Sequence, residues 1–316
     1  MMRLTWATIV AILIAAPTVA QQTAQSAAQQ VSQQAAPPAG QPFPPLSAAA
    51  QAQLQHLLQS WEQQSKGTKT LDSKFTRWHF DMFAAPAGIH ATRADGVIKY
   101  AAPDKGLFRV DRLVFYSGMQ GNKPQFKTQP GQFGEHWVCN GTQLIEFDRQ
   151  KQECRIQKLP PNMQGQQIFN SPLPFVFNLD AQQIQERYWV RQVDSPENNP
   201  EIILVEAWPK RQEDRAQYKL VQIALDAKNF APQALIMYAP NFNAKTAPKW
   251  DHYEFTGVKR NAIGASFQKF LNNFIPDKPP ANWTILRDNF TPPVEPPAEQ
   301  PLRQAAAPKD PPAIRK

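Results

Sequence analysis

The sequence feature that most constrains the fold is the Asn-Gly step at Asn140-Gly141, which stands between two runs of strand-forming residues. The runs span residues 134–139 and 142–148, and a third run follows a second turn at residues 153–159. Asn-Gly favours a type I′ turn, because both central positions of that turn need positive φ. The pattern predicts three antiparallel strands that lie side by side.

The register of these strands predicts an apolar face that another element must cover. If Asp148 pairs with Glu153 across the second turn, the apolar side chains of the last two strands fall on one face of the sheet. The residues expected on that face are Ile145, Phe147, Cys154 and Ile156.

Residues 1–20 have the features of an export signal. Arg3 supplies a positive charge, residues 4–16 form an apolar run, and residues 18–20 provide a small-residue cleavage site. The run is shorter than the roughly 20 residues of a membrane-spanning helix. We expect a cleaved signal peptide and a periplasmic or secreted protein, without a transmembrane segment and without lipidation, since no cysteine lies near Ala20.

Both ends of the mature chain are expected to be disordered. Residues 21–46 are mostly Gln, Ala, Pro and Ser without a charged side chain, and residues 291–316 contain eight prolines. Such segments bury too little apolar surface to offset the loss of chain entropy. The folded part is expected at residues 47–290, which is long enough for one large β domain.

Two cysteines in an exported chain suggest a disulfide, but the expected register separates them. Cys139, paired with Thr142, falls on the face opposite to Cys154. The intervening strand and several residues of offset exceed the roughly 7 Å between Cα atoms that a disulfide spans. We expect two free thiols.

The formal net charge of +8 is spread along the chain rather than gathered in one run. This distribution is typical of a solvated surface, and an anionic membrane surface or envelope polymer is the partner that it would suit. Nucleic acid is not expected as a partner, because the sequence lacks a recognition motif for it. We expect a monomer.

An amphipathic helix is predicted before the first strand. Ser47 is positioned as its N-cap, Lys66-Gly67 ends it, and apolar residues at helical spacing form one stripe. The stripe consists of Leu54, Leu57, Leu58 and Trp61. Short helical pieces are also predicted between residues 171 and 187.

Strand signals occupy most of the remaining chain, with a long loop expected at residues 117–134. The break in alternation after Phe75 indicates either a bulge or a strand that is covered on both faces. Besides the three strands above, signals lie near residues 71–83, 89–93, 96–100, 107–110, 188–193, 202–208, 218–225, 234–238, 250–256 and 267–274. With adjoining signals joined, roughly ten or eleven strands and few helices predict a mainly β (α+β) domain built on a long, curved antiparallel sheet.

The sequence contains no readable catalytic or metal-binding motif. The five histidines show no metal-ligand spacing, and the chain lacks the motifs of hydrolases, phosphate-binding loops and dinucleotide-binding folds. We therefore expect a non-enzymatic protein without a metal or cofactor. The 19 Phe and 8 Trp residues either fill the interior of the curved sheet or line an apolar cavity in it.

Five segments occur in a specific order and spacing. They are 71–77 (LDSKFTR), 96–103 (GVIKYAAP) with Leu107-Phe108 behind it, 138–148 (VCNGTQLIEFD), 170–176 (NSPLPFV) and 267–276. This series resembles the LolA/LolB-like superfamily of periplasmic lipoprotein carriers. The chain is also similar to a family of secreted planctomycete proteins that share its leader and core.

The resemblance implies an incomplete antiparallel β-barrel of about eleven strands, with an N-terminal helix and a short helical lid over an apolar concave face. It also implies an acyl lipid or lipoprotein as ligand, and burial of acyl carbons is favourable by about 0.8 kcal/mol per CH₂. The carriers commonly place Arg where Ala102 precedes Pro103 here. By position, the implied cavity residues are Phe108, Ile145, Phe147 and Ile156, and the implied lid residues are Pro172, Leu173, Phe175 and Phe177.

Two hypotheses on function follow. The first is a secreted or periplasmic carrier or sensor that binds a hydrophobic ligand in the half-barrel. The alternative is an envelope-associated structural or interaction protein with the same fold and a filled interior, attached through its Pro-rich tail.

Overall fold

The computed structural model describes residues 40–129, 134–159, 164, 180–261 and 266–288. Its strands are β1 (Thr70–Asp81), β2 (Thr92–Ala101), β3 (Lys105–Gln120), β4 (Lys123–Gln129), β5 (His136–Asn140), β6 (Gln143–Asp148), β7 (Glu153–Lys158), β8 (Tyr188–Val193), β9 (Ile202–Pro209), β10 (Leu220–Asp226), β11 (Pro232–Tyr238), β12 (Lys249–Arg260) and β13 (Thr284–Asp288). The helical elements are α2 (Ala48–Lys66), α3 (Ala181–Arg187), η4 (Pro196–Asn198), α4 (Gln212–Arg215), α5 (Phe267–Leu271) and η6 (Asn272–Phe274).

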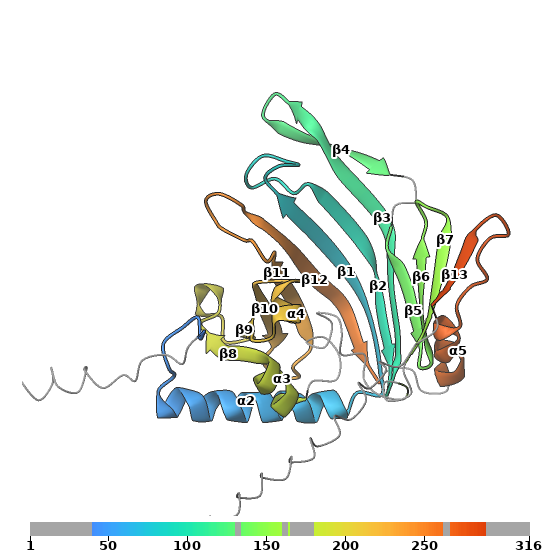
Figure 1. Cartoon of the computed structure of the whole chain (residues 1–316). Helices are drawn as coiled ribbons and strands as arrows, with labels where there is room; N and C mark the ends of the chain where they lie inside the picture. The colour runs from blue at the N-terminus through green and yellow to red at the C-terminus, as the bar shows by residue number, and fades with distance from the viewer. Residues whose placement is uncertain (1–39, 130–133, 160–163, 165–179, 262–265, 289–316) are drawn as a thin grey trace, which may run out of the picture.

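All 13 of these strands belong to one open, curved sheet (Figure 1). The strand order is β13-β7-β6-β5-β3-β2-β1-β12-β11-β10-β9-β8, and β4 pairs with β3 outside this path. The predicted mainly β class and incomplete barrel are confirmed, with 13 strands in the described residues where about eleven were expected.

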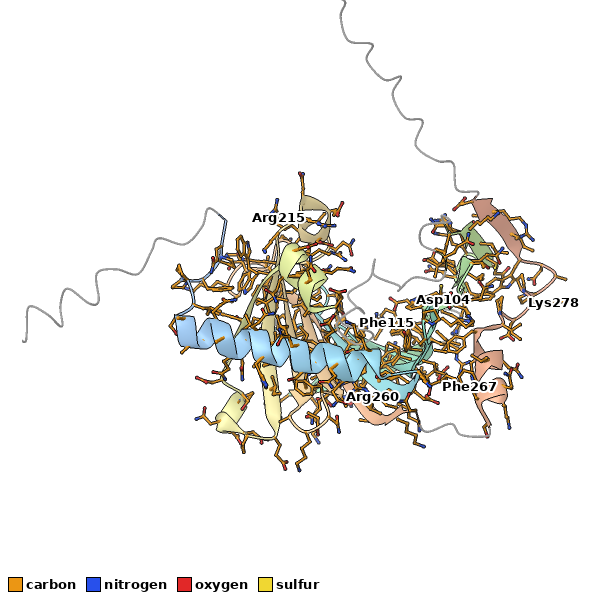
Figure 2. The ribbon with its side chains drawn as sticks, turned by 90° about the horizontal axis from the view of Figure 1, so that it is seen from below. Asp104, Phe115, Arg215, Arg260, Phe267 and Lys278 are labelled. Carbon is orange, nitrogen blue, oxygen red and sulfur yellow. The ribbon has the colours of Figure 1, made fainter. Side chains whose placement is uncertain are left out.

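Helix α2 follows the predicted apolar stripe. The side chain of Ser47 accepts a hydrogen bond from the Ala50 N–H at 3.2 Å, and Gly67 ends the helix. The stripe residues Leu54, Leu57, Leu58 and Trp61 are all buried. In the view from below, α2 crosses in front of the half of the molecule that holds α3 and α4, and Phe267 of α5 lies at the opposite side (Figure 2).

Strands β5, β6 and β7 confirm the predicted meander, with a change at its first turn. Cys139 pairs with Leu144 and not with Thr142. Gly141 takes a positive φ of 97° at the first central position, which fits a type II′ turn in place of the predicted type I′ turn. Oδ1 of Asn140 accepts the N–H of Thr142 at 3.0 Å, so the Asn140 side chain stabilises this turn while its backbone stays in β5.

The second turn has the predicted register, since Asp148 pairs with Glu153 and Phe147 with Cys154. The change at the first turn is a shift of two residues, so Cys139 keeps the face that was predicted for it. Both cysteines are free and buried, which confirms the two expected thiols.

Three local predictions were wrong. Residues 117–134, predicted as a loop, contain the end of β3 and the whole of β4, joined by a turn in which Gly121 has a φ of 58°. The run 267–274, predicted as a strand, forms α5 and η6, because a short apolar run fits a buried helix as well as a strand. The irregularity in β1 lies between Asp72 and Lys74 rather than after Phe75.

The predicted all-antiparallel pairing fails at one edge of the sheet. Strand β13, which the sequence analysis did not predict, pairs with β7 in parallel, with Ile285 opposite Cys154. Residues 159–283 connect the two strands, which is far longer than the dozen or so residues that a parallel connection requires.

The two faces of the sheet carry separate apolar clusters. On the inner face, which is the face that α2 covers, residues of β1 to β3 and of β8 to β12 form one cluster that includes Phe75, Ile98 and Phe108. On the outer face, Val138 and Ile145 belong to a second cluster with residues of α5 and η6.

Three further expectations concern the lid, the residues before α2 and membrane-spanning helices. The expected lid residues Pro172, Leu173, Phe175 and Phe177 lie outside the described residues. Residues 40–46, expected in a disordered linker, are described by the structure, and Phe43 is buried. Within the described residues, none of the helices has the length and apolar character needed to span a membrane.

Candidate functional site

An open pocket of about 350 Å³ lies on the inner face of the sheet, next to the apolar cluster under α2. We call it the inner groove. It is formed by side chains from β1, β2, β3 and β12 and by the residues just before β5. Its apolar wall consists of Val110, Leu113 and Phe115, and its polar wall of Arg77, His79, Glu135 and Asp251.

Strand register explains why these residues meet. Along β1, Phe75, Arg77 and His79 point to the same face, because strand side chains alternate. His79 is opposite Thr92 of β2 on one side and Asp251 of β12 on the other. Groups far apart in the chain are thereby aligned across adjacent strands on the inner face.

Arg77 is the central polar group of the inner groove. Its Nη1 donates to Oε1 and Oε2 of Glu135 at 3.0 and 2.7 Å and to the hydroxyl of Tyr253 at 3.3 Å. Burial disfavours the charged form of Arg77, yet Tyr253 and Glu135 hold its pKa above the ordinary value. The guanidinium is therefore a fixed cation with a buried Nε that has no hydrogen-bond partner within the described residues.

His79 and Asp251 form the second charged pair, with Nδ1 of His79 2.9 Å from Oδ1 of Asp251. A histidine held by a carboxylate resembles the base and orienting group of a catalytic triad. The described hydrogen bonds give this pair no nucleophile, so we assign it no catalytic step. Among the described residues, no group of three or more His, Cys, Asp or Glu could hold a metal ion.

The four cavity residues expected from the sequence do not share one site. Phe108 lies two residues from Val110 along β3, on the inner face, and its ring stacks on Phe75 with centroids 4.6 Å apart. Ile145, Phe147 and Ile156 lie together on the outer face beside η6 and α5. No single cavity can include all four, because the sheet separates Phe108 from the other three.

Sequence reasoning missed the polar wall of the inner groove. Arg77 closes one of the segments that carry the family resemblance, and His79 follows two residues later. Arg77 and His79 follow Phe75 at the strand period of two, and this spacing is the one sequence signal that places them on the inner face. Their partners Glu135 and Asp251 come from distant strands, so the charged pairs need the sheet topology to be recognised.

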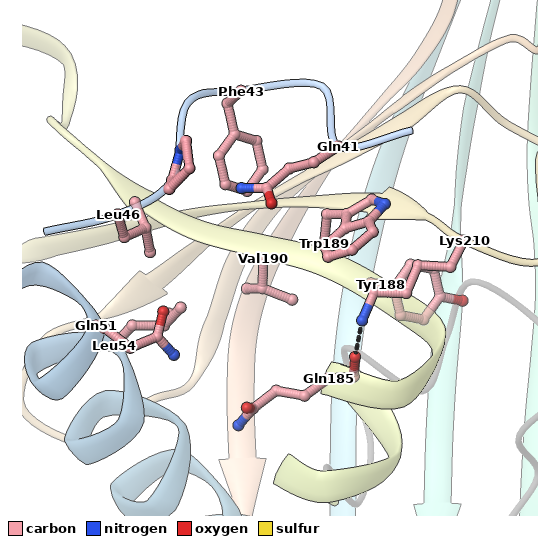
Figure 3. Close-up of a pocket in the computed structure, with 11 residues that line it drawn as sticks. Gln41, Phe43, Leu46, Gln51, Leu54, Gln185, Tyr188, Trp189, Val190 and Lys210 are labelled. Carbon is pink, nitrogen blue, oxygen red and sulfur yellow. Dashed lines mark hydrogen bonds between the residues drawn. The ribbon is translucent and has the colours of Figure 1, made fainter. Parts of the chain in front are cut away.

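A second pocket, of about 400 Å³, lies between residues 41–46, α2 and β8 (Figure 3). Phe43 and Trp189 contribute apolar surface, and Nζ of Lys210 lies 4.3 Å from the centroid of the Trp189 ring. The Lys210 ammonium also donates a hydrogen bond to the backbone carbonyl of Gln185 (Figure 3). This pocket shares no lining residue with the inner groove.

No protein-family model and no curated protein sequence matches the chain. Similar solved structures include an uncharacterized conserved protein from Thermus thermophilus, 10% identical with a TM-score of 0.38, over 75% of this chain and 99% of that chain. A LolA superfamily protein from Nitrosomonas europaea is 10% identical with a TM-score of 0.29, over 66% of this chain and 93% of that chain. The MucA/MucB complex from Pseudomonas aeruginosa contains a chain that is 12% identical, with a TM-score of 0.34, over 68% of this chain and 60% of that one.

One of these solved structures belongs to the superfamily that the sequence segments resemble. Since every TM-score quoted is below 0.5, these likenesses carry no argument about a ligand, a partner or an activity.

Proposed function

We propose that the protein is a secreted or periplasmic, non-enzymatic carrier or sensor that binds an acyl-type hydrophobic ligand on the inner face of its sheet. The inner groove is the observation that supports this most. It is open to solvent, combines an apolar wall with a few placed polar groups, and adjoins the apolar cluster that contains Phe75 and Phe108. Its volume falls within the roughly 300–1,000 Å³ of common ligand sites, in which placed polar groups fix the orientation of the ligand.

In this proposal an acyl chain lies along Val110, Leu113 and Phe115, and Phe108 lies deeper on the same face. Burial of each CH₂ stabilises the complex by about 0.8 kcal/mol, so binding requires no covalent chemistry. A polar head group would lie near Arg77 and Glu135, which are already hydrogen-bonded to each other. Ile145, Phe147 and Ile156 would act on the opposite face, where they hold α5 and η6 against the sheet.

The organisation of the chain supports delivery of the protein to an extracytoplasmic compartment. The proposed export signal is residues 1–20, the ligand-binding unit lies within residues 47–290, and the Pro-rich residues 291–316 form a tail. The proposed ligand is an acyl lipid or the acylated end of a lipoprotein.

The test is titration of the full chain with a fluorescent long-chain fatty-acid probe. Phe115→Asn removes part of the apolar wall at a half-buried position, and we expect about tenfold weaker binding or more. The matched control is Trp189→Ala, which alters the pocket beside residues 41–46 and should leave the affinity unchanged.

Failure of the wild-type chain to bind any acyl probe would overturn the carrier proposal and favour an interaction protein with a filled interior. Loss of binding in Trp189→Ala, with unchanged binding in Phe115→Asn, would place the ligand in the other pocket.

A further inference from the structure

Three segments lie at the end of the sheet that points away from α2 (Figure 1). They are residues 82–91 between β1 and β2, residues 117–127 at the tip of the β3–β4 hairpin, and residues 239–248 between β11 and β12. Strand pairing places them together, because Asp81 is opposite Lys249, Thr92 is opposite Phe115, and Tyr238 is opposite Trp250. We call these three segments the rim.

The rim exposes large apolar side chains. Phe83 is 84% exposed, Met82 is 41% exposed and Met119 is 45% exposed. These are three of the six large hydrophobic residues that are exposed in the described part of the chain. Single exposed apolar residues are ordinary, but exposed side chains of this size on two neighbouring loop tips mark a contact surface.

The rim also carries a net positive charge, which lies on two of its three segments. Residues 82–91, 117–127 and 239–248 contain three lysines and no aspartate or glutamate. The lysines are Lys123, Lys127 and Lys245, and all three are exposed. At the base of the rim Lys249 is paired with Asp81 at 3.0 Å, so that pair adds no net charge.

Aromatic side chains lie directly behind the loop tips on the outer face. Phe80 stacks on Trp250 with ring centroids 4.6 Å apart, and His90 stacks on Phe126 with centroids 4.4 Å apart. All four rings are only half-buried. Of these residues, Trp250 is of the type that is enriched where proteins meet the polar region of a bilayer, because an indole ring combines an apolar body with a polar N–H.

We infer that the rim docks on the surface of an anionic phospholipid bilayer. Phe83, Met82 and Met119 enter the boundary between head groups and acyl chains, and the rim lysines contact the lipid phosphates. Exposed apolar tips with a surrounding positive charge are the combination that such a surface binds. A second copy of this chain is a poorer occupant, because two identical rims would bring lysines against lysines.

This inference goes beyond the proposed ligand binding and does not depend on it. The two are compatible, since Thr92 of the inner groove begins β2 next to the rim and pairs with Phe115 of β3. Docking of the rim would therefore bring the inner groove close to the bilayer, whether or not the groove holds an acyl chain.

The experiment is co-sedimentation of the full chain with vesicles that contain phosphatidylglycerol and with pure phosphatidylcholine vesicles. We expect binding to the anionic vesicles that weakens as salt is added. Phe83→Ser should weaken this binding about tenfold or more, and the triple variant Lys123→Gln, Lys127→Gln, Lys245→Gln should lose the salt-dependent part.

Matched controls lie away from the rim. Ile275→Ser removes a residue that is 66% exposed beside η6, and Lys228→Gln removes an exposed lysine from the β10–β11 connection. Both should bind anionic vesicles like the wild type. Equal loss in these controls, equal binding to neutral vesicles, or sedimentation that requires self-association and not vesicles would each overturn the inference.

Discussion

Arg77 of β1 and Glu135, just before β5, meet across β2 and β3, and Nη1 of the arginine donates to both carboxylate oxygens of the glutamate. Of these two strands, β2 carries small residues at this level, since Arg77 pairs with Ala94 and the next inner-face residue of β2 is Gly96. The charged pair therefore spans the floor of the inner groove, and the width of the groove depends on the absence of larger side chains from β2.

The first prediction concerns Gly96. A Cβ at this position would lie 2.2 Å from the carbonyl oxygen of Arg109 and 2.7 Å from the ring of Phe75. Because the nearest atom belongs to the backbone, relief requires a shift of β3. Gly96→Ala should lower the free energy of unfolding by about 1–3 kcal/mol, measured by urea denaturation.

Gly67→Ala is the matched control for that substitution. Gly67 has a φ of −73°, and its added Cβ would meet only atoms at 3.6 Å and beyond. We expect no loss of stability there. Equal destabilisation by both variants would contradict the close packing of β2 on β3.

A buried ion pair at the start of β8 supports the second prediction. Arg187 donates from Nη2 to Oδ1 of Asp214 at 2.5 Å and from Nε to Oδ2 at 3.2 Å, and the Asp214 side chain is 4% exposed. Asp214→Ala leaves the guanidinium without this carboxylate and should cost about 3–5 kcal/mol.

Glu213→Ala tests whether burial of the ion pair is the reason for the large loss of stability expected in Asp214→Ala. Glu213 is 71% exposed and lies 3.6 Å from Arg211, and a solvent-exposed pair of this kind contributes about 0–1 kcal/mol. Similar losses for Asp214→Ala and Glu213→Ala in chemical denaturation would count against the account.

The third prediction is a loss of stability in acid that arises from His136. Burial, and then the charges of Arg149 and Arg109, lower the pKa of His136 from 6.5 to about 4, although Asp277 and Asp111 act in the opposite direction. Between these two values the unfolded chain binds the proton and the folded chain does not. Stability is therefore complete above about pH 6.5 and is lost as the pH falls to about 4, by at most about 3 kcal/mol.

His136→Phe isolates this contribution. The imidazole stacks on Phe147 with centroids 4.6 Å apart, and a phenyl ring can keep that contact. The difference in unfolding free energy between wild type and variant should change between about pH 7.5 and about pH 4, with the wild type losing more. Parallel curves for the two proteins would assign the acid sensitivity to other groups.

The fourth prediction concerns the thiols. Cys139 and Cys154 are buried on opposite faces of the meander, and burial raises the pKa of each thiol. A thiol reagent should find two free thiols per chain in the denatured, unreduced protein and react slowly with the native protein. Detection of fewer than two after denaturation would mean that a disulfide forms.

The sequence predicted those parts of the fold that depend on local signals. The Ser47 cap, the Leu54–Trp61 stripe and Gly67 define α2 by capping and periodicity alone, and the meander around Asn140 follows from turn chemistry. The first turn still differs from the prediction, because Asn140 uses its side chain in the turn and leaves the positive φ to Gly141.

The remaining elements depend on tertiary contacts. The run Phe267–Phe274 is helical because Phe270 and Phe274 pack against the outer face of the sheet, and no sequence period distinguishes that outcome from a buried strand. The inner groove was less predictable still. Arg77 and Glu135 are 58 positions apart in the sequence, and only the sheet topology brings them together. Phe108 and Ile145 lie on opposite faces of the sheet, in clusters that are covered by different helices.

The central claim is that the inner face holds an acyl-type ligand, and the most direct test is native mass spectrometry of the full chain purified from its own compartment without detergent, followed by lipid extraction. The account predicts a discrete added mass that extracts as an acyl lipid and that is reduced in Phe115→Asn. A mass equal to that of the chain alone, together with no uptake of fatty-acid probes, would contradict it.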